Sequence, residues 1–78
     1  MLKTFTSVEE LVELIVDRRK ELGISQSELA KLCNLSVNGI SKFESNPGDR
    51  EVKLSTLFKI SQFLGFKLSL ELEEWNKN

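Results

Sequence analysis

The side chains of this chain that could take part in chemistry are hydrogen-bonding groups rather than acid–base pairs. Residues 36–42 carry two hydroxyls, an amide and an ammonium group, on Ser36, Ser41, Asn38 and Lys42. The chain has no His and no Tyr, and its only Asp residues are Asp17 and Asp49. Because general acid–base catalysis, nucleophile activation and metal binding need such groups close together, we expect no enzyme, no cofactor and no metal site.

The charges are unevenly distributed along the chain. The formal net charge is −1, but residues 18–67 hold nine Lys and Arg against five acids, a balance of +4. The preceding segment carries −3 and the following segment −2. A locally basic surface is what contact with phosphate groups requires, so the small negative total does not argue against a nucleic-acid partner.

Nothing in the sequence indicates a membrane or a disulfide. No apolar run approaches the ~20 residues that span a bilayer, and the first residues lack the layout of a signal peptide, so we expect a cytoplasmic protein without a membrane partner. Cys33 is the only cysteine, which excludes an internal disulfide. Its position between Leu32 and Leu35 favours a small buried residue over a reactive thiol.

Helix signals account for most of the chain. Ser7 and Glu10 are spaced as a capping box, as are Ser25 and Glu28, and each pair precedes an apolar pattern of helical period. Gly23 and Asn34 are expected to end these two helices. The second helix is expected to carry Leu29, Ala30, Leu32 and Cys33 on or near its inner face.

Two further helices follow. Ser36 is the expected N-cap of a mostly exposed helix whose narrow apolar stripe is Ile40 and Phe43. A loop follows from Ser45 to about Lys53, because its first residues are rich in turn formers. A fourth helix is expected before Gly65, with a broad apolar face of Leu54, Leu57, Phe58, Ile60 and Leu64.

The last part of the chain changes period. From residue 66 to 72, apolar residues alternate with polar ones, which predicts a strand with one apolar face. A single strand needs a neighbour for its backbone groups, and a second copy of the same strand is the simplest partner. An antiparallel ladder places Lys67 opposite Glu71 or Glu73, whereas a parallel ladder would place like charges together.

The stretch "ISQSELAKLCNLSVNGISKFE", residues 24–44, resembles the helix-turn-helix of the lambda-repressor and Cro-like (Xre) family. The resemblance covers about residues 8–64, and it rests on Gln26, Leu29-Ala30, Ile40 and Glu44. It implies a mainly α, lambda-repressor-like domain of four to five helices that binds double-stranded DNA with its third helix in the major groove. The residues then expected to contact DNA are Gln26, Ser27, Ser36, Val37, Asn38, Gly39, Ser41, Lys42, Arg50 and Lys53.

The expected contacts differ in kind. Asn38 can pair with adenine and Val37 can cover a thymine methyl group, while Lys42 can reach guanine or a phosphate. Gly39 is expected to let the backbone approach the DNA, and Ser36 and Ser41 suit phosphate or water-mediated contacts. The resemblance gives Gln26 a phosphate contact and a bracing role toward the recognition helix.

Other polar residues have competing interpretations. Arg50 and Lys53 are expected to clamp phosphates beside the recognition helix. The basic run Arg18, Arg19, Lys20 either adds such contacts or, more simply, complements the dipole at the end of an exposed first helix. Glu44 is expected to bond within the fold.

The loop "ESNPG", the segment "LSTLFKISQFLG" and the ending "FKLSLELEE" resemble the HipB-type antitoxins of toxin–antitoxin modules. This resemblance implies one domain over 1–78, with a helical core at 8–64, a dimerisation strand at 66–73 and a short tail at 74–78. It further implies a homodimer, a palindromic operator in its own operon and a HipA-like serine/threonine kinase toxin as partner. The expected dimer interface is Phe66, Lys67, Leu68, Leu70, Glu71 and Leu72.

Two alternatives stay open at this stage. The chain could instead be a stand-alone Xre repressor without a toxin, or a helical module that binds protein and not DNA. Trp75 either contacts the toxin or packs over the dimer strand.

Overall fold

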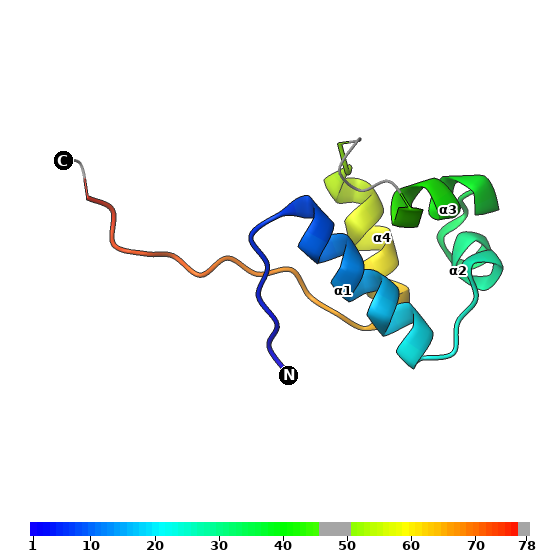
Figure 1. Cartoon of the computed structure of the whole chain (residues 1–78), viewed down its shortest axis with the longest axis horizontal. Helices are drawn as coiled ribbons and strands as arrows, with labels where there is room; N and C mark the ends of the chain where they lie inside the picture. Colours follow the sequence, from blue (N-terminus) through cyan, green and yellow to red (C-terminus); the bar gives the residue numbers. More distant parts are fainter. Residues whose placement is uncertain (46–50, 77–78) are drawn as a thin grey trace.

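The computed structural model describes residues 1–45 and 51–76. It contains α1 (Val8–Glu21), α2 (Gln26–Cys33), α3 (Val37–Ser45) and α4 (Leu54–Leu64). Helices α2 and α3 lie together at one side of the bundle, and the extended N-terminal and C-terminal segments leave from the other part of it (Figure 1). The expected mainly helical architecture is confirmed, with four helices in the described part of the chain.

Side-chain caps explain where the first two helices begin. The Ser7 hydroxyl accepts from the Glu10 N–H at 3.1 Å, while the Glu10 carboxylate accepts from the Thr6 N–H at 3.0 Å. At α1 the Glu10 carboxylate therefore bonds to the N–H of Thr6, and not to that of the N-cap Ser7 as a capping box requires. At α2 the box is complete: Ser25 and Glu28 each accept from the other's N–H, at 3.0 and 3.2 Å.

Left-handed residues end two of the helices. Asn34 adopts φ 55° after α2, and Gly65 adopts φ 69° after α4. These conformations reverse the chain tightly, and Asn and Gly tolerate them better than other residues do. Both helix ends were predicted from the sequence.

The core is one cluster in which all four helices take part. Cys33 is buried within it, as expected, and burial raises the pKa of its thiol above the ordinary value despite the opposing charge of Lys59. The largest fully buried side chains are Val12, Leu29, Ile40, Ile60 and Leu64.

Three apolar residues that were placed on inner faces are exposed. Leu32, Leu54 and Phe58 retain 47%, 63% and 53% of their accessible surface. Helix α4 buries Leu57, Ile60 and Leu64, whose spacing of three and four residues defines a narrow stripe. The broad apolar face predicted for this helix is therefore wrong for Leu54 and Phe58, which lie outside the buried stripe.

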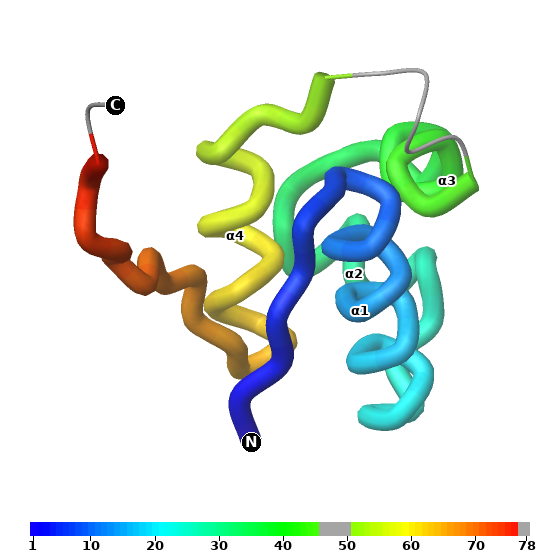
Figure 2. The backbone as a smooth tube through the Cα atoms, turned by 60° about the vertical axis from the view of Figure 1, so that its left-hand side comes forward, coloured from blue at the N-terminus to red at the C-terminus, as the bar shows by residue number. Residues whose placement is uncertain are grey.

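The C-terminal segment lies apart from the bundle beside α4 (Figure 2), and residues 66–76 are extended but form no strand (Figure 1). A strand is defined by hydrogen bonds to a neighbouring strand, and the described residues of this chain include no strand with which the segment could pair. Phe66 and Leu68 are partly buried and pack against the core, whereas Leu70 and Leu72 are 89% and 88% exposed. Within residues 1–45 and 51–76, no helix is long and apolar enough to cross a membrane.

Candidate nucleic-acid interface

Helix α3 presents a polar face to solvent. Ile40 is 1% exposed and anchors the opposite face, while Asn38 and Lys42 lie exposed one turn apart. Val37 is 47% exposed and Ser41 is partly buried. The face that was expected to enter a DNA groove is therefore free to do so.

A buried ion pair holds this helix in place. The Arg19 guanidinium, on α1, donates from Nε and Nη2 to the two carboxylate oxygens of Glu44, on α3, at 2.6 and 2.8 Å. Arg19 also donates from Nη1 to the carbonyl of Ile24 at 2.8 Å, within the turn before α2. Both charged side chains are nearly buried, with 9% and 6% exposed. A paired fork of this geometry fixes the two helices relative to each other.

The proposed exposed basic run at the end of α1 is therefore wrong for Arg19. The residue lies on the inner face of α1 with Val12 and Ile15 and serves the fold. Arg18 is also engaged, since its Nε donates to the carbonyl of Leu64 at 2.8 Å. Two of the positive charges counted between residues 18 and 67 therefore bond within the domain.

Gln26 extends the same network from α2. Its Nε2 donates to Glu44 Oε1 at 2.9 Å, so the expected bracing of the recognition helix is confirmed. Gln26 is the first residue of α2 and Ser27 follows it, exposed. The free N–H groups of a first helical turn attract anions, so the phosphate contact of Gln26 stays a prediction that this position suits.

Glu44 is ionised at neutral pH as a result. Burial by itself would raise the pKa of this carboxyl, but hydrogen bonds from Arg19 and Gln26, with the charges of Arg19 and Lys20, hold the pKa below its ordinary value. The expectation that Glu44 bonds within the fold is confirmed.

Ser36 and Gly39 form a local unit at the start of α3. The Ser36 hydroxyl accepts from the Gly39 N–H at 2.9 Å, which is an N-cap contact. A Cβ added at Gly39 would lie 3.0 Å from the Ser36 oxygen. A side chain at Gly39 would therefore need a small shift of the Ser36 hydroxyl, and the close DNA approach expected for Gly39 stays a prediction.

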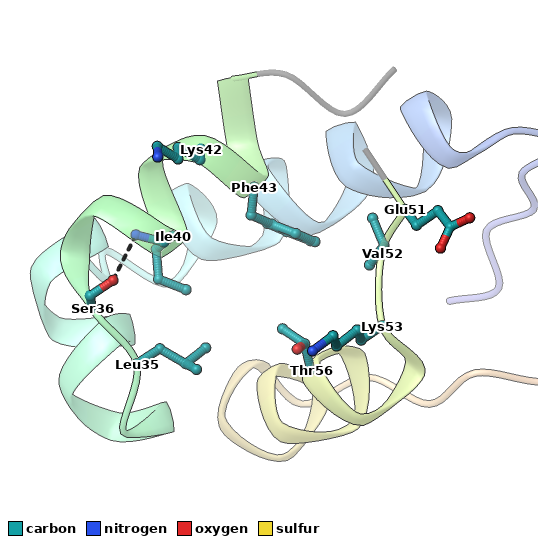
Figure 3. Close-up of a pocket in the computed structure, with 10 residues that line it drawn as sticks. Leu35, Ser36, Ile40, Lys42, Phe43, Glu51, Val52, Lys53 and Thr56 are labelled. Carbon is teal, nitrogen blue, oxygen red and sulfur yellow. Dashed lines mark hydrogen bonds between the residues drawn. The ribbon is translucent and has the colours of Figure 1, made fainter. Parts of the chain in front are cut away.

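A cleft between α3 and the start of α4 was not foreseen from the sequence. It has a volume of about 400 Å³, and Leu35, Ile40, Phe43, Val52 and Thr56 line it (Figure 3). Its remaining lining residues are Ser36, Gly39, Lys42, Glu51 and Lys53. Four predicted DNA-contact residues from two elements therefore meet at this cleft.

The start of α4 adds to the positive character of the cleft. Lys53 is the N-cap residue of α4, and its side chain makes no capping hydrogen bond. A helix N-terminus carries partial positive charge, which adds to that of the lysine. Glu51 opposes this charge at the same cleft. Arg50, the other predicted phosphate clamp, lies outside the described residues.

No group of three or more His, Cys, Asp or Glu residues that could hold a metal ion occurs in the described part of the chain. The hydrogen-bonding and cationic groups assembled at α2, α3 and the start of α4 suit contact with a polyanion.

Comparisons with known proteins agree with this geometry. Residues 15–70 match the family described as helix-turn-helix. The curated protein antitoxin HipB of Escherichia coli O6:H1 strain CFT073 is 42% identical over 52 residues, which cover 67% of this chain and 53% of that protein. The match thus spans about half the length of the curated relative.

Solved structures are similar over most of the chain. A chain of a HipA–HipB–O2–O3 complex superposes with a TM-score of 0.80 at 33% identity, covering 94% of this chain and 100% of that one. A HipB–O1–O2 complex gives 0.78 at 35% identity, with 88% and 97% covered. A HipB–O4 20mer complex gives 0.80 at 33% identity, with 94% and 100% covered.

The lowered pKa of Glu44 predicts an acid-sensitive domain. A carboxyl whose folded pKa lies below its unfolded value of 4.5 stabilises the fold above that pH, and this stabilisation is lost as the pH falls through the folded pKa. We expect Glu44→Gln to lower the free energy of unfolding at pH 7 by about 3 kcal/mol, because Arg19 is left buried and unpaired.

The measurement is urea unfolding followed by circular dichroism, at one protein concentration, between pH 7 and pH 3. The difference between wild type and Glu44→Gln should shrink below pH 4.5. Glu13→Gln, which removes an exposed carboxylate of α1, is the control. A difference that stays constant over this range would show that the ionised state of Glu44 does not support the fold.

Proposed function

The chain belongs to the helix-turn-helix family, and from that premise we propose that it is a sequence-specific DNA-binding antitoxin of the HipB type. As a dimer it represses its own operon, and it binds and neutralises a HipA-like serine/threonine kinase. The observation that carries the DNA-binding part is the exposed polar face of α3, held rigidly by the Arg19, Glu44 and Gln26 network.

The base contacts come from α3. Asn38 offers a donor and an acceptor to adenine, and the exposed Val37 offers an apolar surface to thymine. Lys42, on the same face as Asn38, reaches guanine or a phosphate. Rigid support favours specificity, because a side chain held in one position discriminates between base edges at lower entropic cost.

The phosphate contacts surround that helix. Gln26 and Ser27 stand at the start of α2, and Lys53 stands at the start of α4, across the cleft from Lys42 (Figure 3). Helix N-termini and lysines bind phosphates without reading sequence, so these groups orient α3 in the groove. Arg50 is proposed as a further clamp on sequence grounds alone.

The dimer interface is the C-terminal segment. Phe66 and Leu68 rest on their own core, while Leu70 and Leu72 are exposed. In an antiparallel ladder centred on Ser69, Leu70 lies opposite Leu68 of the partner subunit and Leu72 opposite Phe66 of the partner subunit. The exposed leucines of each segment thereby pack beside the partly buried Phe66 and Leu68 of the partner subunit.

The charges agree with that ladder. Centring on Ser69 also places Lys67 opposite Glu71 of the partner subunit, and centring on Leu70 places it opposite Glu73 of the partner subunit. Each of these three residues, Lys67, Glu71 and Glu73, is exposed in the single chain and is therefore accessible to a partner subunit.

The solved HipB relatives support the antitoxin part of the proposal. They are complexes with HipA and with O1, O2, O3 and O4. Trp75 is 79% exposed near the C-terminus, and it either anchors the kinase or packs over the ladder. A large aromatic side chain is a common anchor in protein interfaces.

DNA binding is tested on the promoter of the chain's own operon by fluorescence anisotropy. The logarithm of the association constant K should fall linearly with log salt, at a slope of about −0.9 per phosphate contact.

Asn38→Ala should weaken binding to the operator by ~1–3 kcal/mol and leave binding to random DNA nearly unchanged. Gln62→Ala, which removes an exposed amide of α4, is the matched control. Equal loss on both DNAs would refute a base contact, and a flat salt response would refute DNA binding.

Dimerisation through the ladder is tested by sedimentation. Leu70→Lys places two charges in the apolar face of the ladder, so the dimer should weaken by at least ~2 kcal/mol. Gln62→Lys, which adds the same charge at an exposed position of α4 outside the ladder, is the control. An intact Leu70→Lys dimer would show that the interface lies elsewhere.

The kinase partner is tested by co-expression with the product of the gene immediately downstream. We expect that product to be a HipA-like kinase that elutes with this chain on size exclusion and loses its activity. If Trp75 is an anchor, Trp75→Ala should cost about 2 kcal/mol of complex affinity and leave the dimer intact. A downstream gene of another kind, with no kinase bound, would leave a stand-alone repressor.

A further inference from the structure

Arg18 joins the end of α1 to the end of α4. Its Nε donates to the carbonyl of Leu64, the last residue of α4, at 2.8 Å. Its Nη1 lies 3.7 Å from the carboxylate of Glu21, in an exposed pair. The two bonded residues are far apart in sequence, so this contact ties two helices that the chain itself does not connect directly.

The carbonyl that Arg18 takes is one that the helix cannot satisfy. The last four carbonyls of a helix have no partner within it. The Ser61 carbonyl accepts from the N–H groups of Gly65 and Phe66, at 2.9 and 3.2 Å, which closes the left-handed turn. Arg18 satisfies the carbonyl of Leu64, and its positive charge complements the negative end of the helix dipole.

The guanidinium also lies against the turn from which the C-terminal segment departs. A Cβ built on Gly65 would come within 3.4 Å of Arg18 Nη2. Immediately after this turn, Phe66 and Leu68 pack on the core, and the segment then runs away from the helices (Figure 1). The Arg18 contact is therefore at the root of the segment that we assign to dimerisation.

The neighbouring residue, Arg19, points from α1 in a different direction. Successive residues of a helix are turned by about 100°, so Arg18 and Arg19 reach different elements. Arg19 holds Glu44 of α3, and Arg18 holds the end of α4. One turn of α1 thus bonds both the recognition helix and the root of the C-terminal segment.

We propose that Arg18 is a positioning residue that sets the distance between the two recognition helices of the dimer, and hence the spacing of the DNA half-sites. The proposal rests on the proposed function, because it needs a dimer formed by the C-terminal segment. Arg18 fixes the direction in which this segment leaves the domain. In a two-fold dimer, any change in that direction rotates both domains and moves both α3 helices.

The first experiment reads this distance without DNA. A nitroxide is attached to Lys31→Cys on the exposed side of α2, while Cys33 is 3% exposed and thus protected from the reagent. Pulsed electron–electron resonance then gives the distance distribution across the dimer. Wild-type Arg18 should give one narrow distribution, and Arg18→Ala a shifted or broader one. Arg18→Lys, which keeps a cationic donor, should restore it in part, and Glu21→Gln should leave it unchanged.

The second experiment reads the consequence on DNA. Operator variants with one base pair added to or removed from the centre are compared with the natural spacing and with a single half-site. The penalty for wrong spacing should fall about fivefold in Arg18→Ala, the size expected for loss of one partly buried hydrogen bond. Affinity for the single half-site should stay within about twofold, since α3 and its Arg19 support are intact.

The outcomes separate the two proposals. An unchanged distance distribution and spacing penalty in Arg18→Ala would overturn the role of Arg18 and leave the dimeric repressor standing. Equal loss on full and half-sites would also overturn it, because that result indicates general damage to the fold. A monomeric wild type would instead refute the dimer, and with it the premise of this inference.

Discussion

The buried ion pair between Arg19 and Glu44 is the interaction on which the arrangement of this small domain depends. Helices α2 and α3 have eight and nine residues, too short to be stable in isolation, so tertiary contacts must hold them. Apolar packing at Ile40, with Phe43 partly buried against the same core, supplies the attraction, but apolar packing is non-directional and does not by itself fix the rotation of a short helix. The fork from Arg19, with the amide of Gln26 on the same carboxylate, removes that freedom by joining α1, α2 and α3 at one point.

This arrangement also separates the charges that support the fold from those that face a partner. Arg18 bonds to the end of α4 and Arg19 bonds to Glu44, whereas Lys42 and Lys53 line the cleft beside α3. Net charge is therefore a poor guide to what the molecule binds. A chain of net charge −1 can still present positive helix ends and lysines on one face, because the field near a surface depends on the local groups.

The two ends of the domain differ in chemistry. The polar face of α3 suits base edges, and the apolar C-terminal segment suits a second copy of itself. The last turn of α1 lies between these two regions and bonds to both through adjacent arginines. A dimeric repressor needs this kind of connection, because the affinity of two linked half-site contacts depends on how well their separation matches the DNA repeat.

The sequence by itself determined the features whose causes are local. Serine caps, the left-handed Asn34 and Gly65, and the stripe of α3 follow from residues three or four apart, so the helices and the exposed polar face were predictable. Only the tertiary structure decided the partners of Arg18 and Arg19, the exposure of Leu32, Leu54 and Phe58, and the cleft at Lys42 and Lys53. These depend on contacts between distant residues, such as Arg19 with Glu44 and Arg18 with Leu64, which no local period encodes. Neither the sequence nor the tertiary structure decided the pairing of residues 66–72, because a strand takes its hydrogen bonds from a neighbouring strand and the described residues include none.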